Sequence, residues 1–177
     1  MKLESERLIL RPIEESDVPA LFPLINDADV AADMLSVPHP YPEDEYVPWI
    51  RKAREAMERR EQFPMAIVLK ETGLPIGACD ILNISWDHMR AEIAYWIGKE
   101  YWGRGYTTEA AKRMIEFGFE ELGLERISAG CFPRNKASAR IIEKLGFTFE
   151  GLARHAYKKD GEFLDELRFG ILRSDSR

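Results

Sequence analysis

The order of segments between residues 90 and 132 constrains the fold of this chain most. Arg90–Ile97 has the composition of a strand, a turn with two glycines follows, and apolar side chains recur at helical spacing from about Thr108 to Leu122. Arg126–Phe132 is a second strand-like segment. A strand, a helix and a further strand in this order predict a βαβ unit in the middle of an α+β domain.

The segments around that unit predict the rest of a single domain that covers residues 1–177. Prolines concentrate between residues 27 and 48, so that stretch is expected to be a loop with at most a short helical turn. We expect a mixed, mainly antiparallel central sheet of about seven strands flanked by about four helices. The expected elements are, in order, a strand at 7–13, helices at 16–26 and 49–61, strands at 65–70, 76–84 and 90–97, a helix at 108–122, a strand at 126–132, a helix at 135–145 and two closing strands.

Composition excludes several classes of partner. The 177 residues are 45% hydrophobic, which fills one core without metal or disulfide staples, and Cys79 and Cys131 are expected as free thiols inside strands. The net charge of -6 argues against a nucleic-acid partner, because binding to phosphates requires clustered basic residues. No run approaches the roughly 18 apolar residues that span a bilayer, and the opening residues lack a signal-peptide core. We therefore expect a cytoplasmic protein without a membrane partner.

Gly103 and Gly105 lie in the turn between the strand that ends at Ile97 and the helix that begins near Thr108. Glycine adopts positive φ and lets a ligand approach the backbone amides. Free N–H groups at a helix N-terminus, together with the helix dipole, form an anion site that suits a pyrophosphate. The spacing fits neither the nucleotide P-loop nor the dinucleotide fingerprint. The residues alone leave phosphate binding and an ordinary turn as open alternatives.

Four motifs in fixed order narrow these alternatives. The motifs are Glu92–Ile97, Tyr101–Ala110, Asn135–Ser138 and Glu143–Phe147. They resemble successive motifs of the GNAT acetyltransferases, and more closely the branch typified by the RimJ and RimL ribosomal-protein N-terminal acetyltransferases. The resemblance extends over nearly the whole chain and implies acetyl-CoA as cosubstrate, no metal, and direct attack of a primary amine on the acetyl group.

The resemblance also implies where the cofactor lies. The end of the strand before the turn pairs with the pantetheine, and the glycine turn holds the pyrophosphate. Asn135 is first of all expected to cap the following helix, and by resemblance its amide contacts the pantetheine arm. The implied cofactor-binding residues are Tyr95, Trp96, Ile97, Trp102, Gly103, Arg104, Gly105, Tyr106, Thr107 and Asn135.

Acetyl transfer requires a base for the amine and an acid for the departing thiolate. Many GNAT enzymes use a tyrosine on the second helix as the acid, but Ile142 occupies that position. Ser138 is therefore the candidate acid, directly or through water. Glu92 is the candidate base, with Asp80 on the neighbouring strand as the alternative, although either carboxylate could face solvent or pair with Arg90. The predicted catalytic residues are Ser138, Glu92 and Asn135.

The acceptor amine is the least constrained feature. A protein N-terminal amine is the preferred acceptor, and the alternatives are a small amine, such as a polyamine, amino acid or antibiotic, or a non-catalytic acyl-CoA-binding module. A covalent route through Cys131 lacks an adjacent base. The closing hairpin, with Tyr157 and Phe163, suggests a homodimer. His88 is expected at the surface, and the candidate residues for the substrate wall are Met34, Tyr41, Trp49 and Trp86.

Overall fold

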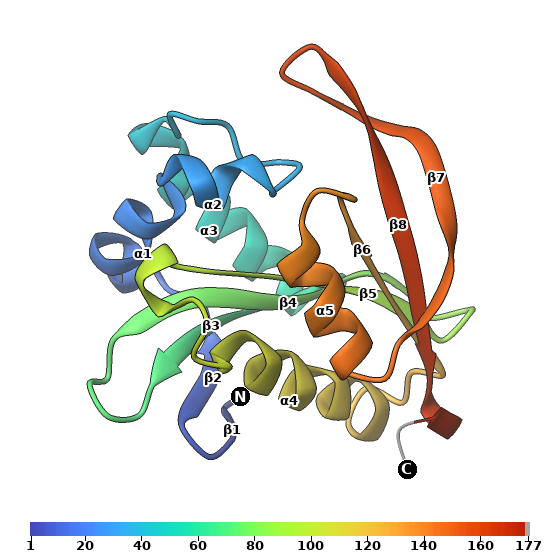
Figure 1. The fold of residues 1–177 in the computed structure, drawn as a ribbon. Coiled ribbons are helices and arrows are strands. Elements are labelled where there is room, and N and C mark those ends of the chain that lie inside the picture. Colours follow the sequence, from blue (N-terminus) through green and yellow to red (C-terminus); the bar gives the residue numbers. More distant parts are fainter. Residues whose placement is uncertain (176–177) are drawn as a thin grey trace.

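One eight-stranded sheet runs through the protein in the order β1-β2-β3-β4-β5-β6-β8-β7 (Figure 1). The structure is a computed structural model that describes residues 1–175. All neighbouring strands are antiparallel except β5 and β6, which are parallel as the βαβ unit predicts. The strands are Leu3–Glu4 (β1), Leu8–Pro12 (β2), Phe63–Leu69 (β3), Pro75–Ser85 (β4), Arg90–Ile97 (β5), Arg126–Cys131 (β6), Thr148–Lys159 (β7) and Glu162–Leu172 (β8).

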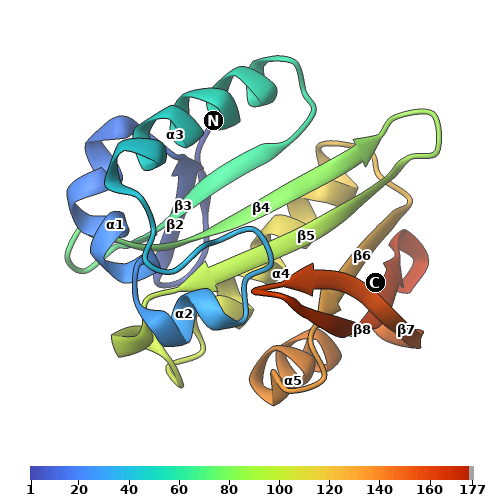
Figure 2. The same ribbon diagram turned by 90° about the horizontal axis from the view of Figure 1, so that it is seen from above.

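Helices cover both faces of this sheet, and each face has its own core. One core packs helices α1 to α3 against one face, and the other packs α4 and α5 against the opposite face (Figure 2). None of the helices within residues 1–175 is both long and apolar enough to cross a membrane. The helices are Val18–Ile25 (α1), Ala28–Ala32 (α2), Glu43–Glu58 (α3), Tyr106–Glu120 (α4) and Lys136–Lys144 (α5).

Successive side chains of β4 and β5 point to opposite faces of the sheet, so each of these strands contributes to both cores. Cys79 and Ile81 of β4 pack in the core beneath α4, whereas Ala78 packs in the core beneath α1 and α3. In β5, Ile93 belongs to the α4 core and Trp96 to the opposite one. These two strands therefore form a floor with one set of side chains on each side.

The predicted α+β fold is confirmed, and the structure differs from the prediction in three details. The sheet has eight strands because the two-residue β1 is too short to leave a pattern, and α2 makes a fifth α-helix. Helix α3 begins at Glu43 rather than Trp49 and runs through Pro48. Three acidic residues in its first turn interact favourably with the positive end of the helix dipole. The burial of Tyr46 and Ile50 offsets the loss of the backbone hydrogen bond that Pro48 cannot donate.

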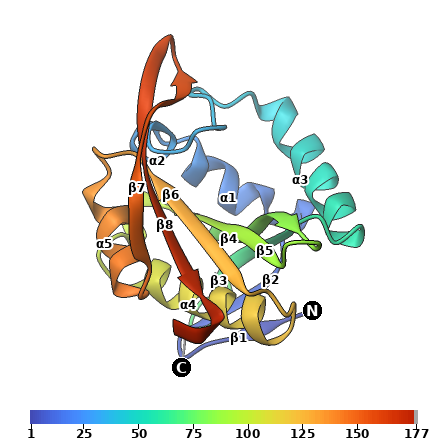
Figure 3. The same ribbon diagram turned by 90° about the vertical axis from the view of Figure 1, so that its right-hand side faces the viewer.

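Strands β5 and β6 part soon after they begin. Only Arg90–Glu92 of β5 pairs with Arg126–Ser128 of β6, and beyond these residues the two strands share no register. Strand β6 stays paired with β8 over its full length, as β5 does with β4 over most of its length. Figure 3 shows β6 and β8 running steeply away from β4 and β5. The sheet is thus split into two parts that meet at one end.

A buried ion pair next to α1 gives a test of the fold. Asp17 is 3% exposed and accepts two hydrogen bonds from Arg11, at 2.6 and 2.8 Å. We expect Arg11→Met to lower the free energy of unfolding by about 3 kcal/mol, because it leaves a buried carboxylate without its cation. Arg51→Met is the control, since Arg51 pairs with Glu15 on the surface and its loss should change little. Equal effects in chemical denaturation would contradict this prediction.

Candidate active site

A cavity of about 780 Å³ lies where β5 and β6 part, and we call it the cleft. Its walls come from both faces of the sheet, from the loop before α4 and from the segment after α2. Asp80 and Glu92 line it from the α1 and α3 side, whereas Tyr95 lines it from the α5 side, because neighbouring residues of a strand point to opposite faces. The cleft therefore passes through the sheet.

On the α5 side, two hydroxyl groups meet. The Tyr95 hydroxyl and the Ser138 Oγ lie 3.0 Å apart, and either of them can donate the hydrogen bond. Burial raises the pKa of the Tyr95 phenol, so the group stays protonated at neutral pH. Asn135 accepts a hydrogen bond from the Ser138 amide at 2.9 Å, which confirms its predicted role as the cap of α5. Ile142, at the position of the missing helix tyrosine, is buried in the core.

On the opposite side, two carboxylates lie on neighbouring strands. Asp80 faces Ala94 in the register and Glu92 faces Leu82, which makes the two carboxylates diagonal neighbours on one face. The Asp80 Oδ1 is buried with no hydrogen-bond partner within residues 1–175, and burial raises the pKa of Asp80 to about 7. Glu92 accepts a hydrogen bond from Asn83 at 2.9 Å. Asp80 thus has the protonation behaviour of a general base at neutral pH.

Glu166 of β8 is a further carboxylate in the cleft, and the sequence did not point to it. It is 8% exposed and accepts hydrogen bonds from Tyr157 at 3.0 Å and Arg168 at 2.8 Å. Its side chain lies against Gly130, where a Cβ atom would come within 2.3 Å of the Glu166 Oε1. In a sequence, an acidic residue two positions before an arginine in a strand is typical of a surface ion pair, so the pattern did not indicate that Glu166 lies in the cleft.

The turn before α4 has the backbone conformation that the glycines predict. Gly103 and Gly105 have φ values of 74° and 79°, and Gly105 begins the helix without any side-chain cap among the described residues. Arg7 holds this turn in place: it donates to the Arg104 carbonyl at 3.0 Å and to Glu109 at 2.7 Å. Glu109 is thereby paired with Arg7 and does not cap the amides at the start of α4.

The predicted site residues fall into two groups. Those that the structure brings together around the cleft are Glu92, Tyr95, Trp96, Ile97, Trp102, Gly103, Thr107, Asn135 and Ser138. Arg104 and Gly105 are exposed on the outside of the turn, and the Tyr106 ring lies under Arg7 at 4.6 Å, so none of the three lines the cleft.

Three of the four predicted wall residues also line the cleft, namely Met34, Tyr41 and Trp49. Trp86 does not, and this prediction was wrong. Its indole N–H donates to the Arg60 carbonyl at 3.1 Å, and the Arg60 guanidinium lies 4.7 Å from its ring, which holds Trp86 at the far end of the sheet. His88 is exposed, as predicted.

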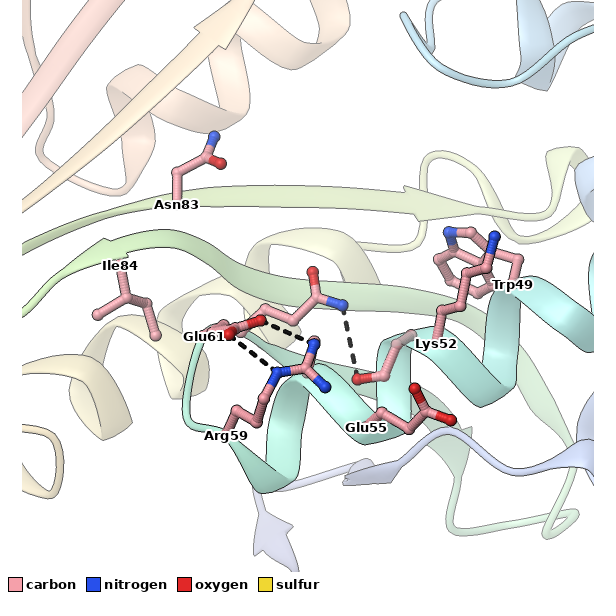
Figure 4. Close-up of a pocket in the computed structure, with 10 residues that line it drawn as sticks. Trp49, Lys52, Glu55, Arg59, Glu61, Asn83 and Ile84 are labelled. Atoms are coloured by element: carbon pink, nitrogen blue, oxygen red, sulfur yellow. Dashed lines mark hydrogen bonds and ion pairs between the residues drawn. The ribbon is translucent and has the colours of Figure 1, made fainter.

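A second groove, of about 570 Å³, adjoins the cleft between α3 and the ends of β3 and β4. Trp49, Gln62 and Asn83 line both spaces, so the groove continues the cleft on the side of Asp80 and Glu92. Figure 4 shows Arg59 and Glu61 paired along this groove, beside Lys52 and Glu55 of α3. An extended ligand in the cleft would have room to continue here.

Cys131 ends β6 inside the cleft. Both cysteines are free, as expected. Burial raises the pKa of the Cys131 thiol to about 11, so the thiol is protonated at neutral pH and is a poor nucleophile. Within residues 1–175, no group of His, Cys, Asp or Glu is arranged to hold a metal ion.

With this geometry in view, comparison with known proteins identifies the family. The model of the "Acetyltransferase (GNAT) domain" matches residues 7–148. The chain belongs to the GNAT acetyltransferase family. GNAT relatives with solved structures include complexes with coenzyme A and with acetyl-CoA. The protein is therefore an acyltransferase of the GNAT type.

Individual relatives support this assignment over the full length. The chain is 32% identical over 180 residues to an uncharacterized N-acetyltransferase, p20, of Bacillus licheniformis, covering 98% of this chain and 97% of the relative. It is 28% identical to the spermidine N(1)-acetyltransferase of Escherichia coli, over 92% of this chain and 84% of that one. The fold matches that of RimL, a ribosomal-protein α-N-acetyltransferase solved with coenzyme A, with a TM-score of 0.89 at 21% identity over all of both chains.

The turn before α4 can be tested with a matched pair of glycines. Gly103 and Gly73 have φ values of 74° and 70°, and neither has another atom close to its Cβ position. We expect Gly103→Pro to weaken acetyl-CoA binding by at least about tenfold, because proline cannot adopt positive φ and lacks the N–H group. Gly73→Pro, in the turn between β3 and β4, creates the same conflict with positive φ at a residue that does not line the cleft, and also removes the hydrogen bond from the Gly73 amide to the Leu69 carbonyl. Calorimetric affinities that fall equally in both variants would contradict a role for this turn.

Proposed function

We propose that this GNAT acetyltransferase transfers the acetyl group of acetyl-CoA to the N-terminal amine of a protein. One observation carries the proposal: the cleft passes through the sheet, with carboxylates on one face and a pair of hydroxyl groups on the other. An acceptor amine and a thioester that meet in the middle would each have the proton acceptor or donor that acetyl transfer needs.

The cofactor half of the cleft offers three features that suit coenzyme A. The β6 side of β5 from Ile93 to Ile97 has no strand partner in the described part of the chain. The Ile97 carbonyl accepts a hydrogen bond from the Trp102 indole at 3.0 Å, and the other backbone groups on this side are available to the amides of a pantetheine arm. The uncapped start of α4, with Gly103 beside it, suits the pyrophosphate. Asn135 lines the cleft between them, and its amide nitrogen can donate to the arm.

The proposed acetyl transfer uses groups on both faces of the sheet. The amine nitrogen attacks the thioester carbonyl carbon, and Asp80 accepts the proton that the nitrogen loses. An N-terminal amine has a pKa of about 8, close enough to the pKa of about 7 for Asp80 to make this transfer efficient. The C–S bond then breaks, and Ser138 protonates the thiolate while Tyr95 donates to Ser138 in turn. Glu92 attracts the ammonium form of the acceptor before attack.

Two observations bear on the acceptor. A peptide is favoured because the groove beyond Asn83 extends the cleft past the point of attack, and RimL acts on a ribosomal protein. A small polyamine is the second candidate, because five carboxylates line the cleft and no Lys, Arg or His does so among the described residues. The spermidine acetyltransferase of Escherichia coli is a relative with that substrate. A homodimer through the hairpin, where Phe163 is 59% exposed, stays a prediction.

The test of the proposed function is a thiol-release assay with acetyl-CoA over three acceptor panels: N-terminal peptides, polyamines and aminoglycosides. Turnover with peptides whose α-amine is free, and none with the same peptides after N-terminal acetylation, is expected. Turnover with polyamines alone would replace the first candidate by the second. Tight binding of acetyl-CoA without thiol release on any panel would establish a non-catalytic binding module.

The pH dependence distinguishes the two candidate bases. If Asp80 is the base, kcat/KM for the acceptor rises with pH through about 7, since the carboxylate must be deprotonated to accept a proton. We expect Asp80→Asn to lower kcat at least about 100-fold and to remove this inflection. Glu92→Gln should mainly raise the acceptor KM and keep the inflection. The reverse pattern would assign the base to Glu92, as the sequence predicted.

The hydroxyl pair can be tested with two tyrosines that both line the cleft. Tyr95→Phe and Ser138→Ala are each expected to lower kcat by about 100-fold, and the double variant should lose little more, because the two groups act as one relay. Tyr41→Phe removes a hydroxyl on the acceptor side and serves as the control. Additive losses in the double variant would show that the hydroxyl groups act independently.

A further inference from the structure

Lys159, the last residue of β7, makes an unusual set of contacts with the other half of the chain. Its Nζ donates hydrogen bonds to the backbone carbonyls of Ala31 at 2.9 Å, Met34 at 2.5 Å and Val37 at 2.9 Å. An ammonium group has three N–H donors, so all of them are used. The side chain is half-buried, and burial lowers the pKa of Lys159. Three converging carbonyls compensate a partly desolvated charge of this kind.

A second cation from the C-terminal half binds the same segment. Arg134, just before α5, donates to the Ala32 carbonyl at 2.5 Å and to the Asp33 carboxylate at 3.2 Å. Its guanidinium also lies 5.2 Å from the ring of Phe132. Ala31 and Ala32 are the last residues of α2, whose final carbonyls have no partner within the helix. The Ala31 carbonyl also accepts from the Met34 amide at 3.1 Å, so the two cations add to the backbone hydrogen bonds at this helix end.

These contacts cross the open side of the cleft. The hairpin of β7 and β8 projects beyond the rest of the sheet (Figure 1), and seen from above its tip reaches the segment between α2 and α3 (Figure 2). Residues 33–37 of that segment line the cleft on the acceptor side. The wall that an acceptor meets is thus attached to the opposite half of the protein by Lys159 and Arg134.

We propose that Lys159 determines acceptor specificity by fixing residues 31–37 as a rigid wall of the cleft. This inference rests on the proposed function, because it concerns the acceptor side of the same site. A wall held in one position favours an acceptor whose first residue is small enough to fit beside Met34 and Val37. Without the ammonium group, residues 31–37 lose their three shared contacts, the acceptor site is less preorganised, and bulkier acceptors enter.

The test compares two neighbouring lysines of β7. Lys159→Met keeps the length of the aliphatic chain and removes the ammonium group. Lys158→Met is the matched control, because Lys158 is exposed and its ammonium group interacts only with the Phe163 ring, at 5.4 Å, among the described residues. Hydrogen exchange of the amides of residues 31–37 measures the wall directly and needs no acceptor. Steady-state kinetics with peptides that begin with Ser or with Leu measure specificity.

In Lys159→Met we expect faster exchange across residues 31–37, an acceptor KM raised by about tenfold, an unchanged KM for acetyl-CoA, and a smaller preference for Ser over Leu. Lys159→Arg should restore part of each effect, since a planar guanidinium keeps the charge but cannot meet three carbonyls in the same way. Unchanged exchange, or faster exchange with unaltered preference, would overturn the proposal. If the wild type acetylates only small amines, the proposed peptide acceptor fails, while the exchange data and the relative KM for two amines of different width still test the role of Lys159.

Discussion

Only three residue pairs join β5 to β6, and the cleft exists because this pairing is so short. Both strands keep their outer partners, β4 and β8, so each half of the sheet is stiff up to the point of divergence. An ordinary parallel sheet would fill this space with main-chain hydrogen bonds. Here the unpaired edge becomes the wall of a cavity that opens on both faces, and a buried backbone edge of this kind needs a ligand to satisfy it.

Beyond the point where β5 and β6 diverge, the two faces of the sheet present different chemical groups to the cleft, although they are only one strand apart. Asp80 and Glu92 lie in a face without basic side chains among the described cleft residues, and burial raises the pKa of Asp80 although a backbone hydrogen bond from Met65 acts in the opposite direction. Tyr95, one position from Ala94 on the same strand, points the other way and meets Ser138. The period of two along a β-strand is sufficient to produce this separation, and no domain boundary or moving part is required.

Local features of this design could be predicted from the sequence. The bounds of β5, the turn at Gly103 and Gly105, and the cap at Asn135 each depend on neighbouring residues, and each is confirmed. The pairing of Tyr95 with Ser138 depends instead on how far the strands diverge, which no pattern encodes. With Ile142 at the position of the helix tyrosine, the sequence left Ser138 as the candidate acid, and in the structure the Tyr95 phenol lies 3.0 Å from the Ser138 Oγ.

The features that the sequence did not predict depend on contacts between segments that lie far apart in the chain. Glu166 is buried because Gly130, on a strand far away in sequence, leaves room for its side chain. Lys159 acquires three acceptors only because a long hairpin reaches across to α2. Helix α3 begins before Pro48 because Tyr46 finds a place in the core. In each case tertiary contact outweighs a correct local preference.

The passage of the cleft through the sheet also bears on how products leave. In the proposed reaction the acetylated acceptor lies on the face of Asp80 and the free thiol of the cofactor on the face of Ser138, so the two products have separate mouths of the cleft through which to leave. Substitutions that reshape one mouth leave the other mouth intact. A sheet of this construction allows the acceptor side to diversify among relatives while the cofactor side stays the same.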